Sequence, residues 1–189
     1  GREYCRWIDD NYLMVGKGYF YKGNFKEAAK TFNFIKSEYL DNEIYFEATL
    51  WLIRSYVEQQ DFVSAEIELE EILHDRRIPS RLEKQLTLVA ADFYMQKKDF
   101  NSATSALLKG AKLIKRKKAR LNYILGQIYQ EALNYTLAQK HYEIVLRSNP
   151  DYEMAFNAKM NLARSLESGN PDLSKMKKKL LRMAKDEKN

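Results

Sequence analysis

The chain has 189 residues, of which 45% are hydrophobic and 31% charged, and its formal net charge is +6. These proportions are typical of a folded, soluble protein. Three prolines and seven glycines are too few for a turn-rich sheet architecture, so helix is the favoured class. No apolar run approaches the ~18 residues that a membrane span requires, and the N-terminus has no apolar signal core.

The sequence offers little for catalysis. A single cysteine, Cys5, excludes an internal disulfide. It is interpreted as a small buried or half-buried residue of the first helix, with a reactive or lipidated thiol as the alternative. His74 and His141 have no second ligand at metal-binding spacing, and each is predicted to be a half-exposed helix residue. Phosphate-binding glycine loops and nucleophile elbows are absent from the sequence. We therefore expect no enzyme activity, cofactor, metal or small-molecule substrate.

Apolar residues at three- and four-residue steps predict a series of helices. The first two are expected at about 4–22 and from Phe25 to about Tyr39. A second pair follows from Glu43 to Glu58 and from Phe62 to about His74, and a third pair is built around Tyr94 and Ala103. After the fourth pair, a fifth begins at Tyr152, breaks at Gly169-Asn170-Pro171 and resumes near Leu173 as a lysine-rich helix.

The fourth pair, residues 122–150, has the most complete pattern. Gly126 lacks a side chain and lets a neighbouring helix approach closely, while Ala138 is small where the two helices cross. Tyr142 then fills the space one turn later. Asn134 is placed to cap the second helix, and Asn149-Pro150 ends it, because proline biases the preceding residue toward extended geometry.

Three columns of residues recur at the same intervals of 37, 38 and 35 residues. They are Tyr19, Tyr56, Tyr94 and Tyr129; Phe25, Phe62, Phe100 and Tyr135; and Ala28, Ala65, Ala103 and Ala138. A fourth column, Asn24, Asp61, Asp99 and Asn134, places a helix-capping residue before each member of the second. The aromatic residues are therefore predicted to belong to the core first.

The spacings L-G-x2-Y at Leu125, Gly126 and Tyr129, and A-x3-aromatic at Ala138 and Tyr142, resemble the tetratricopeptide repeat. The resemblance implies an all-α, right-handed superhelical solenoid of antiparallel helix pairs, expected as a single domain over 1–189. The repeats are expected at about 9–42, 46–79, 84–117 and 119–152, with a partial or capping pair at 153–186. It also implies a concave surface, lined by the first helix of each pair, that binds segments of other proteins.

Within that family, segments such as IDDNYLMVGKGYFYKGNFKEAAKTFNFI and NPDYEMAFNAKMNLARS resemble the repeat region of Bacteroidetes lipoproteins of gliding motility and type IX secretion, the SprE/PorW type. This resemblance implies a scaffold at the periplasmic face of the outer membrane, cut from a longer lipoprotein whose lipid anchor lies outside this chain. Leu180, Leu181 and Met183 near the chain end would then be covered by a following helix.

Charge is unevenly distributed. Residues 58–75 contain seven acids and no lysine or arginine, and carboxylates such as Glu70 and Glu71 are interpreted as a solvated face. Residues 109–120 contain seven basic residues and no acid. This run could bind nucleic acid through phosphates, but it has no aromatic residue to stack on bases; the alternative is a helix end whose lysines complement the helix dipole. A structural spacer without a groove ligand is a third possibility.

The candidate binding surface follows from the repeat register. Leu13, Leu50, Leu88 and Tyr123 occupy equivalent places on the first helices and should face the concave side. The predicted protein-binding residues are Lys17, Tyr21, Arg54, Glu58, Asp92, Gln96, Tyr123, Gln127 and Glu131. Lys17 and Arg54 could hold an acidic segment, with Tyr21 supplying apolar contact. Because leucines stand where some tetratricopeptide domains carry a carboxylate-binding set, that particular ligand is not expected.

Overall fold

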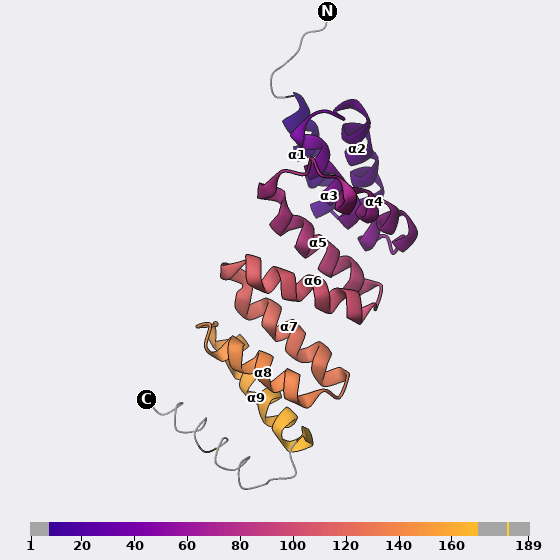
Figure 1. The fold of residues 1–189 in the computed structure, drawn as a ribbon. Coiled ribbons are helices and arrows are strands. Elements are labelled where there is room, and N and C mark those ends of the chain that lie inside the picture. Colours follow the sequence, from indigo (N-terminus) through magenta and orange to yellow (C-terminus); the bar gives the residue numbers. More distant parts are fainter. Residues whose placement is uncertain (1–7, 170–180, 182–189) are drawn as a thin grey trace, which may run out of the picture. The chain divides into compact units, whose positions relative to one another are not determined.

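A computed structural model describes residues 8–169 and 181, and this part of the chain contains nine α-helices, two short 3-10 helices and no strand (Figure 1). The helices are α1 (Ile8–Tyr21), α2 (Phe25–Glu38), α3 (Glu43–Glu58), α4 (Phe62–His74), η1 (Ser80–Leu82), α5 (Glu83–Gln96), α6 (Phe100–Leu113), η2 (Lys115–Lys117), α7 (Lys118–Glu131), α8 (Tyr135–Leu146) and α9 (Tyr152–Gly169). The all-α prediction is confirmed.

The predicted helix bounds agree closely with the structure. Helices α3 and α4 begin and end at the predicted residues, and α2 ends one residue before Tyr39. Cys5 and the lysine-rich helix expected from Leu173 lie outside the described residues, as do Leu180 and Met183; Leu181 is exposed.

Contacts between Cα atoms divide the chain into two compact units, residues 1–103 and 104–189, and each is described by itself. In the first unit, α3 lies between the pair α1–α2 and the helices α4 and α5, and contacts all four. In the second unit, α7, α8 and α9 contact one another. The single domain expected over 1–189 stays a prediction.

Four three-residue turns close the helix pairs, and all four have the same backbone hydrogen bonds. In each, the N–H of the predicted capping residue donates to the carbonyl of the tyrosine five positions earlier, from Asn24 to Tyr19 at 2.9 Å through Asn134 to Tyr129 at 2.8 Å. The residue before it has positive φ: Gly23 (77°), Gln60 (59°), Lys98 (62°) and Leu133 (58°). This is a Schellman motif, which satisfies the last carbonyls of a helix. The tyrosine column therefore marks helix ends, and its side chains are only half-buried or, at Tyr19, exposed.

Three of the four predicted caps are confirmed. The side chains of Asp61, Asp99 and Asn134 accept hydrogen bonds from backbone N–H groups three residues on, at 3.1, 3.1 and 3.2 Å. Asn24 makes no side-chain cap, although its backbone (φ −86°, ψ 63°) matches that of Asp61 (−84°, 74°). Asn149 is also not extended as predicted: its φ is 49°, a left-handed conformation that asparagine tolerates better than most residues.

Replacing Leu133 by glycine is expected to stabilise the protein by about 0.5–1 kcal/mol. A leucine at φ 58° carries a penalty of about 1–2 kcal/mol that glycine avoids, and this gain exceeds the extra chain entropy that glycine loses on folding. The side chain is 70% exposed, so little packing is lost. Urea unfolding measures the effect. Leu73→Gly, in the regular helix α4, is the matched control and should destabilise; a destabilised Leu133→Gly would contradict the strain argument.

In the core of each unit, small buried residues of one helix pack against large side chains of the next. Ala28, Ala65, Ala103 and Ala138 are all fully buried. In the first pair the ring of Phe32 lies against Gly16, and in the fourth the ring of Tyr142 lies against Gly126, where an added Cβ would meet the ring at 2.5 and 2.6 Å. The predicted close approach at Gly126 is confirmed. No helix in the described residues has both the length and the apolarity to cross a membrane.

Candidate functional site

Six of the nine predicted binding residues lie on α1, α3 and α5 of the first unit. Helix α3 contacts both α1 and α5, so the first helices of the first three pairs lie side by side. Lys17 and Tyr21 come from α1, Arg54 and Glu58 from α3, and Asp92 and Gln96 from α5. Glu58 and Gln96 are the last residues of their helices and are exposed. We call this surface the α1–α3–α5 face.

Trp51, which the sequence pattern did not single out, is the centre of this face. Its ring lies 5.2 Å from Phe20 and 5.8 Å from Tyr21 between centroids, and the Arg54 guanidinium lies 4.2 Å from its centroid. Arg54 is also 5.0 Å from the ring of Phe20. We call Phe20, Tyr21, Trp51 and Arg54 the Trp51 cluster. A guanidinium held over aromatic faces is oriented while its N–H groups stay free to bind a ligand.

The Trp51 cluster combines buried aromatic rings with exposed side chains. Phe20 is buried and Trp51 is partly buried against the core of the first unit, whereas Tyr21 is 74% exposed. The buried rings hold the base in place, since core side chains sit in fixed rotamers. A partner could therefore contact Tyr21 and Arg54 without rearranging the fold.

Lys17 differs from Arg54 in how its charge is used. Its ammonium group donates to Glu47 Oε1 at 2.8 Å, and both side chains are about one-fifth exposed. Arg81 also reaches Glu47 at 4.0 Å and Glu43 at 2.9 Å. The positive charge of Lys17 is thus largely balanced within the protein, so an acidic ligand would find its free cation at Arg54.

Asp92 gives the face a second polar character. Its carboxyl group is reached by solvent, yet surrounding protein atoms desolvate it and raise its pKa, while the nearby positive charge of Arg54 opposes that rise. No salt bridge joins Asp92 to another described residue. Arg54 is therefore attracted toward Asp92 but not fixed by it, and the face offers an acceptor beside a donor.

The other three predicted residues belong to the second unit, on α7. Gln127 and Glu131 are exposed, whereas Tyr123 is partly buried against the core and its hydroxyl accepts a hydrogen bond from Asn161 at 3.0 Å. Two residues of the predicted concave row are also in the core: Leu13 is 6% and Leu50 2% exposed. These two leucines are therefore not accessible to a ligand, and the prediction that their row faces the concave side stays a prediction.

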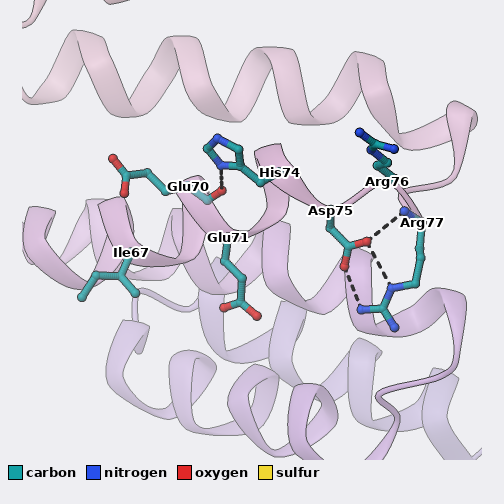
Figure 2. Close-up of a pocket in the computed structure, with 7 residues that line it drawn as sticks. All are labelled: Ile67, Glu70, Glu71, His74, Asp75, Arg76 and Arg77. Atoms are coloured by element: carbon teal, nitrogen blue, oxygen red, sulfur yellow. Dashed lines mark hydrogen bonds and ion pairs between the residues drawn. The ribbon is translucent and has the colours of Figure 1, made fainter.

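An open pocket of about 660 Å³ lies along the exposed side of α4 and the segment after it (Figure 2). Ile67, Glu70, Glu71, His74, Asp75, Arg76 and Arg77 line it. Arg77 donates two side-chain hydrogen bonds to Asp75, at 3.1 and 2.8 Å, and His74 Nδ1 donates to the Glu70 carbonyl at 2.7 Å. Three of its lining side chains are thus engaged within the pocket and Glu71 is engaged by Lys36 outside it, which makes the pocket a weaker candidate than the Trp51 cluster.

The sequence predicts that the acidic run of residues 58–75 is a solvated face, but several of its carboxylates pair with lysines of other helices. Glu68 and Glu71 both pair with Lys36 of α2, at 2.6 and 2.8 Å, and Glu66 pairs with Lys97 at 2.6 Å. Asp61 caps α4. The alternation of acids along α4 was visible in the sequence, but their basic partners lie 31 to 35 residues away.

His141 is buried, which corrects the prediction that it is half-exposed. Its ring stacks on Tyr129 with centroids 5.3 Å apart, and its Nδ1 donates to Asn122 Oδ1 at 2.9 Å. Burial lowers its pKa, and the positive charge of Lys140 lowers it further. His74, also predicted to be half-exposed, is exposed at the end of α4. Among residues 8–169, no group of three or more His, Cys, Asp or Glu side chains is arranged to hold a metal ion.

The helix pairs, their repeated turns and the buried small residues define an α-helical repeat protein, and its fold is that of tetratricopeptide-repeat structures. MamA aligns with a TM-score of 0.69 at 16% identity, over 95% of this chain and 89% of that one. Pseudomonas aeruginosa PilF gives 0.65 at 18% identity, over 84% and 68%. A thermophilic TPR protein of Thermus thermophilus, TTC0263, gives 0.58 at 16% identity, over 93% and 98%.

A scan against protein-family models gave no match, and a search of curated proteins gave none either. At 14–18% identity, the structural likeness establishes the fold and leaves the function to be argued from the residues of this chain.

Proposed function

We propose that this protein is a non-enzymatic interaction scaffold, and that the α1–α3–α5 face of its first unit binds a segment of another protein. The observation that carries the proposal is the Trp51 cluster, in which Arg54 stacks on Trp51 at 4.2 Å beside a tyrosine that is 74% exposed. Tyrosine, tryptophan and arginine are the residues that most often dominate the energetics of protein interfaces.

The chemistry of the face favours a ligand with one carboxylate and one apolar side chain. Arg54 supplies a planar donor for the carboxylate, Tyr21 supplies apolar area, and Lys17 contributes little because Glu47 neutralises it. A strongly acidic ligand would meet Asp92 and Glu58 as well, so long runs of acid should be excluded. Gln96 is positioned as a further hydrogen-bonding residue at the end of α5.

Selection of peptides from a random library against the purified chain tests this proposal. We expect peptides that combine an acidic with an aromatic or aliphatic residue, and we expect Arg54→Gln and Tyr21→Ala each to weaken their binding about tenfold or more. Tyr152→Ala, on α9 of the second unit, is the matched control, because Tyr152 is 86% exposed. Binding that survives both Arg54→Gln and Tyr21→Ala would remove the face from consideration.

A narrower role follows from the sequence resemblance to gliding-motility and type IX secretion lipoproteins. We propose that the scaffold acts in the cell envelope, at the periplasmic face of the outer membrane, and supports a secretion process. Tyr123, Gln127 and Glu131 on α7 are proposed as protein-binding residues of the second unit. Fractionation of native cells with an antibody against the chain is the test; recovery in the cytoplasmic fraction would refute the envelope location and leave the binding face untouched.

A further inference from the structure

The basic run of residues 109–120 is the strongest charged feature that the binding face does not use. Its seven cations are Lys109, Lys112, Lys115, Arg116, Lys117, Lys118 and Arg120. The structure places them at the end of α6, on η2 and in the first turn of α7, all within the second unit. We call this segment the basic turn. It carries +7, so the rest of the chain has a net charge of −1.

No acidic side chain among the described residues pairs with the described cations of the basic turn. The six side chains that the structure describes, all but that of Arg116, are exposed, and none forms a salt bridge with a described residue. The turn itself is held by backbone hydrogen bonds, from Ile114 N to the Gly110 carbonyl at 2.8 Å and from Lys117 N to the Ile114 carbonyl at 3.2 Å. The acidic run differs, since most of its carboxylates have partners.

Helix electrostatics explains only part of the run. Lys112 lies in the last turn of α6, where a positive charge is favourable. Lys118 and Arg120 lie in the first turn of α7, which contains no acid and whose preceding residue, Lys117, makes no side-chain cap. Positive charge at a helix N-terminus is unfavourable. The dipole interpretation therefore accounts for the lysine at the end of α6, whereas the two cations in the first turn of α7 oppose that helix's dipole.

Apolar side chains accompany the cations at the end of α6. Leu108 is 36% and Leu113 37% exposed, and they stand four residues from Lys112 and Lys109 respectively, so each leucine shares a helix face with a lysine. Residues 109–120 contain no aromatic side chain on which a nucleic-acid base could stack. Exposed leucine beside unpaired lysine suits an interface with phosphate on one side and hydrocarbon on the other.

We propose that the basic turn docks on the surface of a membrane rich in anionic phospholipid. The lysines and Arg120 contact headgroup phosphates, with their alkyl stems lying along the surface, while Leu108 and Leu113 reach the acyl boundary. The contact is peripheral and reversible, and it is driven mainly by charge. Its residues belong to the second unit, whereas the α1–α3–α5 face belongs to the first.

Sedimentation of the purified chain with vesicles tests the proposal. The chain should bind vesicles of phosphatidylcholine mixed with phosphatidylglycerol, release them as salt is raised, and leave vesicles of phosphatidylcholine alone unbound. The triple variant Lys115→Gln, Lys117→Gln, Lys118→Gln should lower partition at least about tenfold. Its melting temperature should be unchanged or raised, since neutralising Lys118 removes a charge that opposes the α7 dipole.

A control variant with the same net charge separates a local from a general effect. Lys22→Gln, Lys26→Gln, Lys98→Gln neutralises three exposed lysines of the first unit, and it should retain most of the vesicle binding. Leu113→Ser should lower partition at least about threefold, because its apolar contact is lost. Equal loss in both triple variants, or no binding to anionic vesicles, would overturn the proposal. A duplex DNA that binds more tightly than the vesicles, with no effect of Leu113→Ser, would overturn it in favour of nucleic acid.

Discussion

Replacing Gly126 by leucine is expected to lower the free energy of unfolding by about 1–3 kcal/mol, the usual effect of overpacking a core. A Cβ at this position would lie 2.6 Å from Cε1 and 2.8 Å from Cδ1 of Tyr142. The ring cannot move aside freely: it is fully buried, and its hydroxyl donates to Gln130 Oε1 at 2.9 Å. Burial also raises the pKa of Tyr142, so the phenol stays a neutral donor. Chemical unfolding measures the loss.

Gly18→Ala is the matched control for a helical glycine. A Cβ at Gly18 would meet no atom within 4 Å, so alanine should stabilise α1 by about 0.5–1 kcal/mol through its better helix propensity. Opposite signs for the two glycines are therefore expected. An unchanged unfolding midpoint for Gly126→Leu would show that the Tyr142 ring relocates without cost.

The other helix pairs suggest a compensating change. In the first and fourth pairs, a glycine of the first helix (Gly16 or Gly126) faces an aromatic ring of the second helix. In the second and third pairs, Ile53 and Ala91 stand at the position of the glycine, and Leu69 and Leu107 stand at the position of the ring. A smaller partner thus goes with a larger first-helix residue. The double variant Gly126→Ala, Tyr142→Leu should accordingly be more stable than the sum of the two single changes allows, by about 0.5–3 kcal/mol of coupling.

The sequence predicted the local structure well because each signal lay within one helix pair. The alanine column, the capping column and the spacing to Tyr142 specify the hairpin from residues at most about twenty positions apart. The positive φ at Gln60, Lys98 and Leu133 could not be predicted from residue type, since only Gly23 among the four turns is the residue that normally marks a left-handed conformation. The tyrosine five residues before each capping residue does mark the turn, because its carbonyl accepts the hydrogen bond that closes it.

The candidate site was predicted less completely, because its contacts cross from one helix pair to the next. Lys17 and Glu47 are 30 residues apart, and nothing in the spacing of either helix shows that they pair. Trp51 falls outside the repeat columns, so the repeat pattern does not mark it, although it stands three residues before Arg54, a spacing that puts both on one helix face. His141 had no metal ligand nearby, and its hydrogen bond to Asn122 required the fold.

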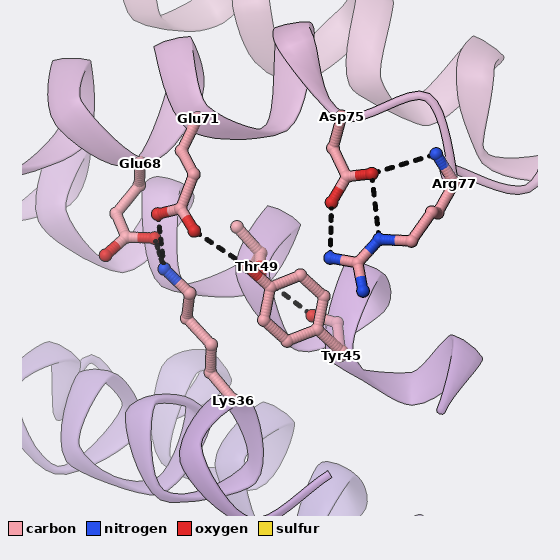
Figure 3. Close-up of polar contacts among 7 residues, drawn as sticks. All are labelled: Lys36, Tyr45, Thr49, Glu68, Glu71, Asp75 and Arg77. Atoms are coloured by element: carbon pink, nitrogen blue, oxygen red, sulfur yellow. Dashed lines mark hydrogen bonds and ion pairs between the residues drawn. The ribbon is translucent and has the colours of Figure 1, made fainter. Parts of the chain in front are cut away.

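Replacing Lys36 by methionine is expected to destabilise the protein by about 2 kcal/mol, less than the ~3–5 kcal/mol for a fully buried ion pair because solvent still reaches this one. The Lys36 ammonium group lies between Glu68 and Glu71, at 2.6 and 2.8 Å, and Glu71 also accepts a hydrogen bond from the Tyr45 hydroxyl at 3.0 Å (Figure 3). Both Lys36 and Glu68 are only 15% exposed. Methionine keeps the alkyl chain but leaves two neighbouring carboxylates without their cation.

Lys30→Met on the same helix is the matched control. Lys30 pairs with Glu27 at 2.8 Å, but its side chain is 73% exposed, so its removal should change stability by no more than about 0.5 kcal/mol. Equal effects of the two substitutions would show that the Lys36 cluster is worth no more than a surface ion pair.

The stability contributed by this cluster should also depend on pH at both ends of the range. Burial by itself lowers the pKa of Lys36, but hydrogen bonds to Glu68 and Glu71 outweigh it and raise that pKa to about 12. A raised lysine pKa gives stability that is fully present below the unfolded value of about 10.4 and is lost as pH rises through about 12. The hydrogen bond from Lys36 lowers the pKa of Glu71, so its contribution is present above about pH 4.3 and is lost as pH falls.

Unfolding measured across pH should therefore show Lys36→Met closest to the wild-type protein at the acidic and alkaline extremes, and furthest from it between about pH 5 and 10. A difference that stays constant across that range would mean that Lys36 acts through packing of its alkyl chain rather than through its charge.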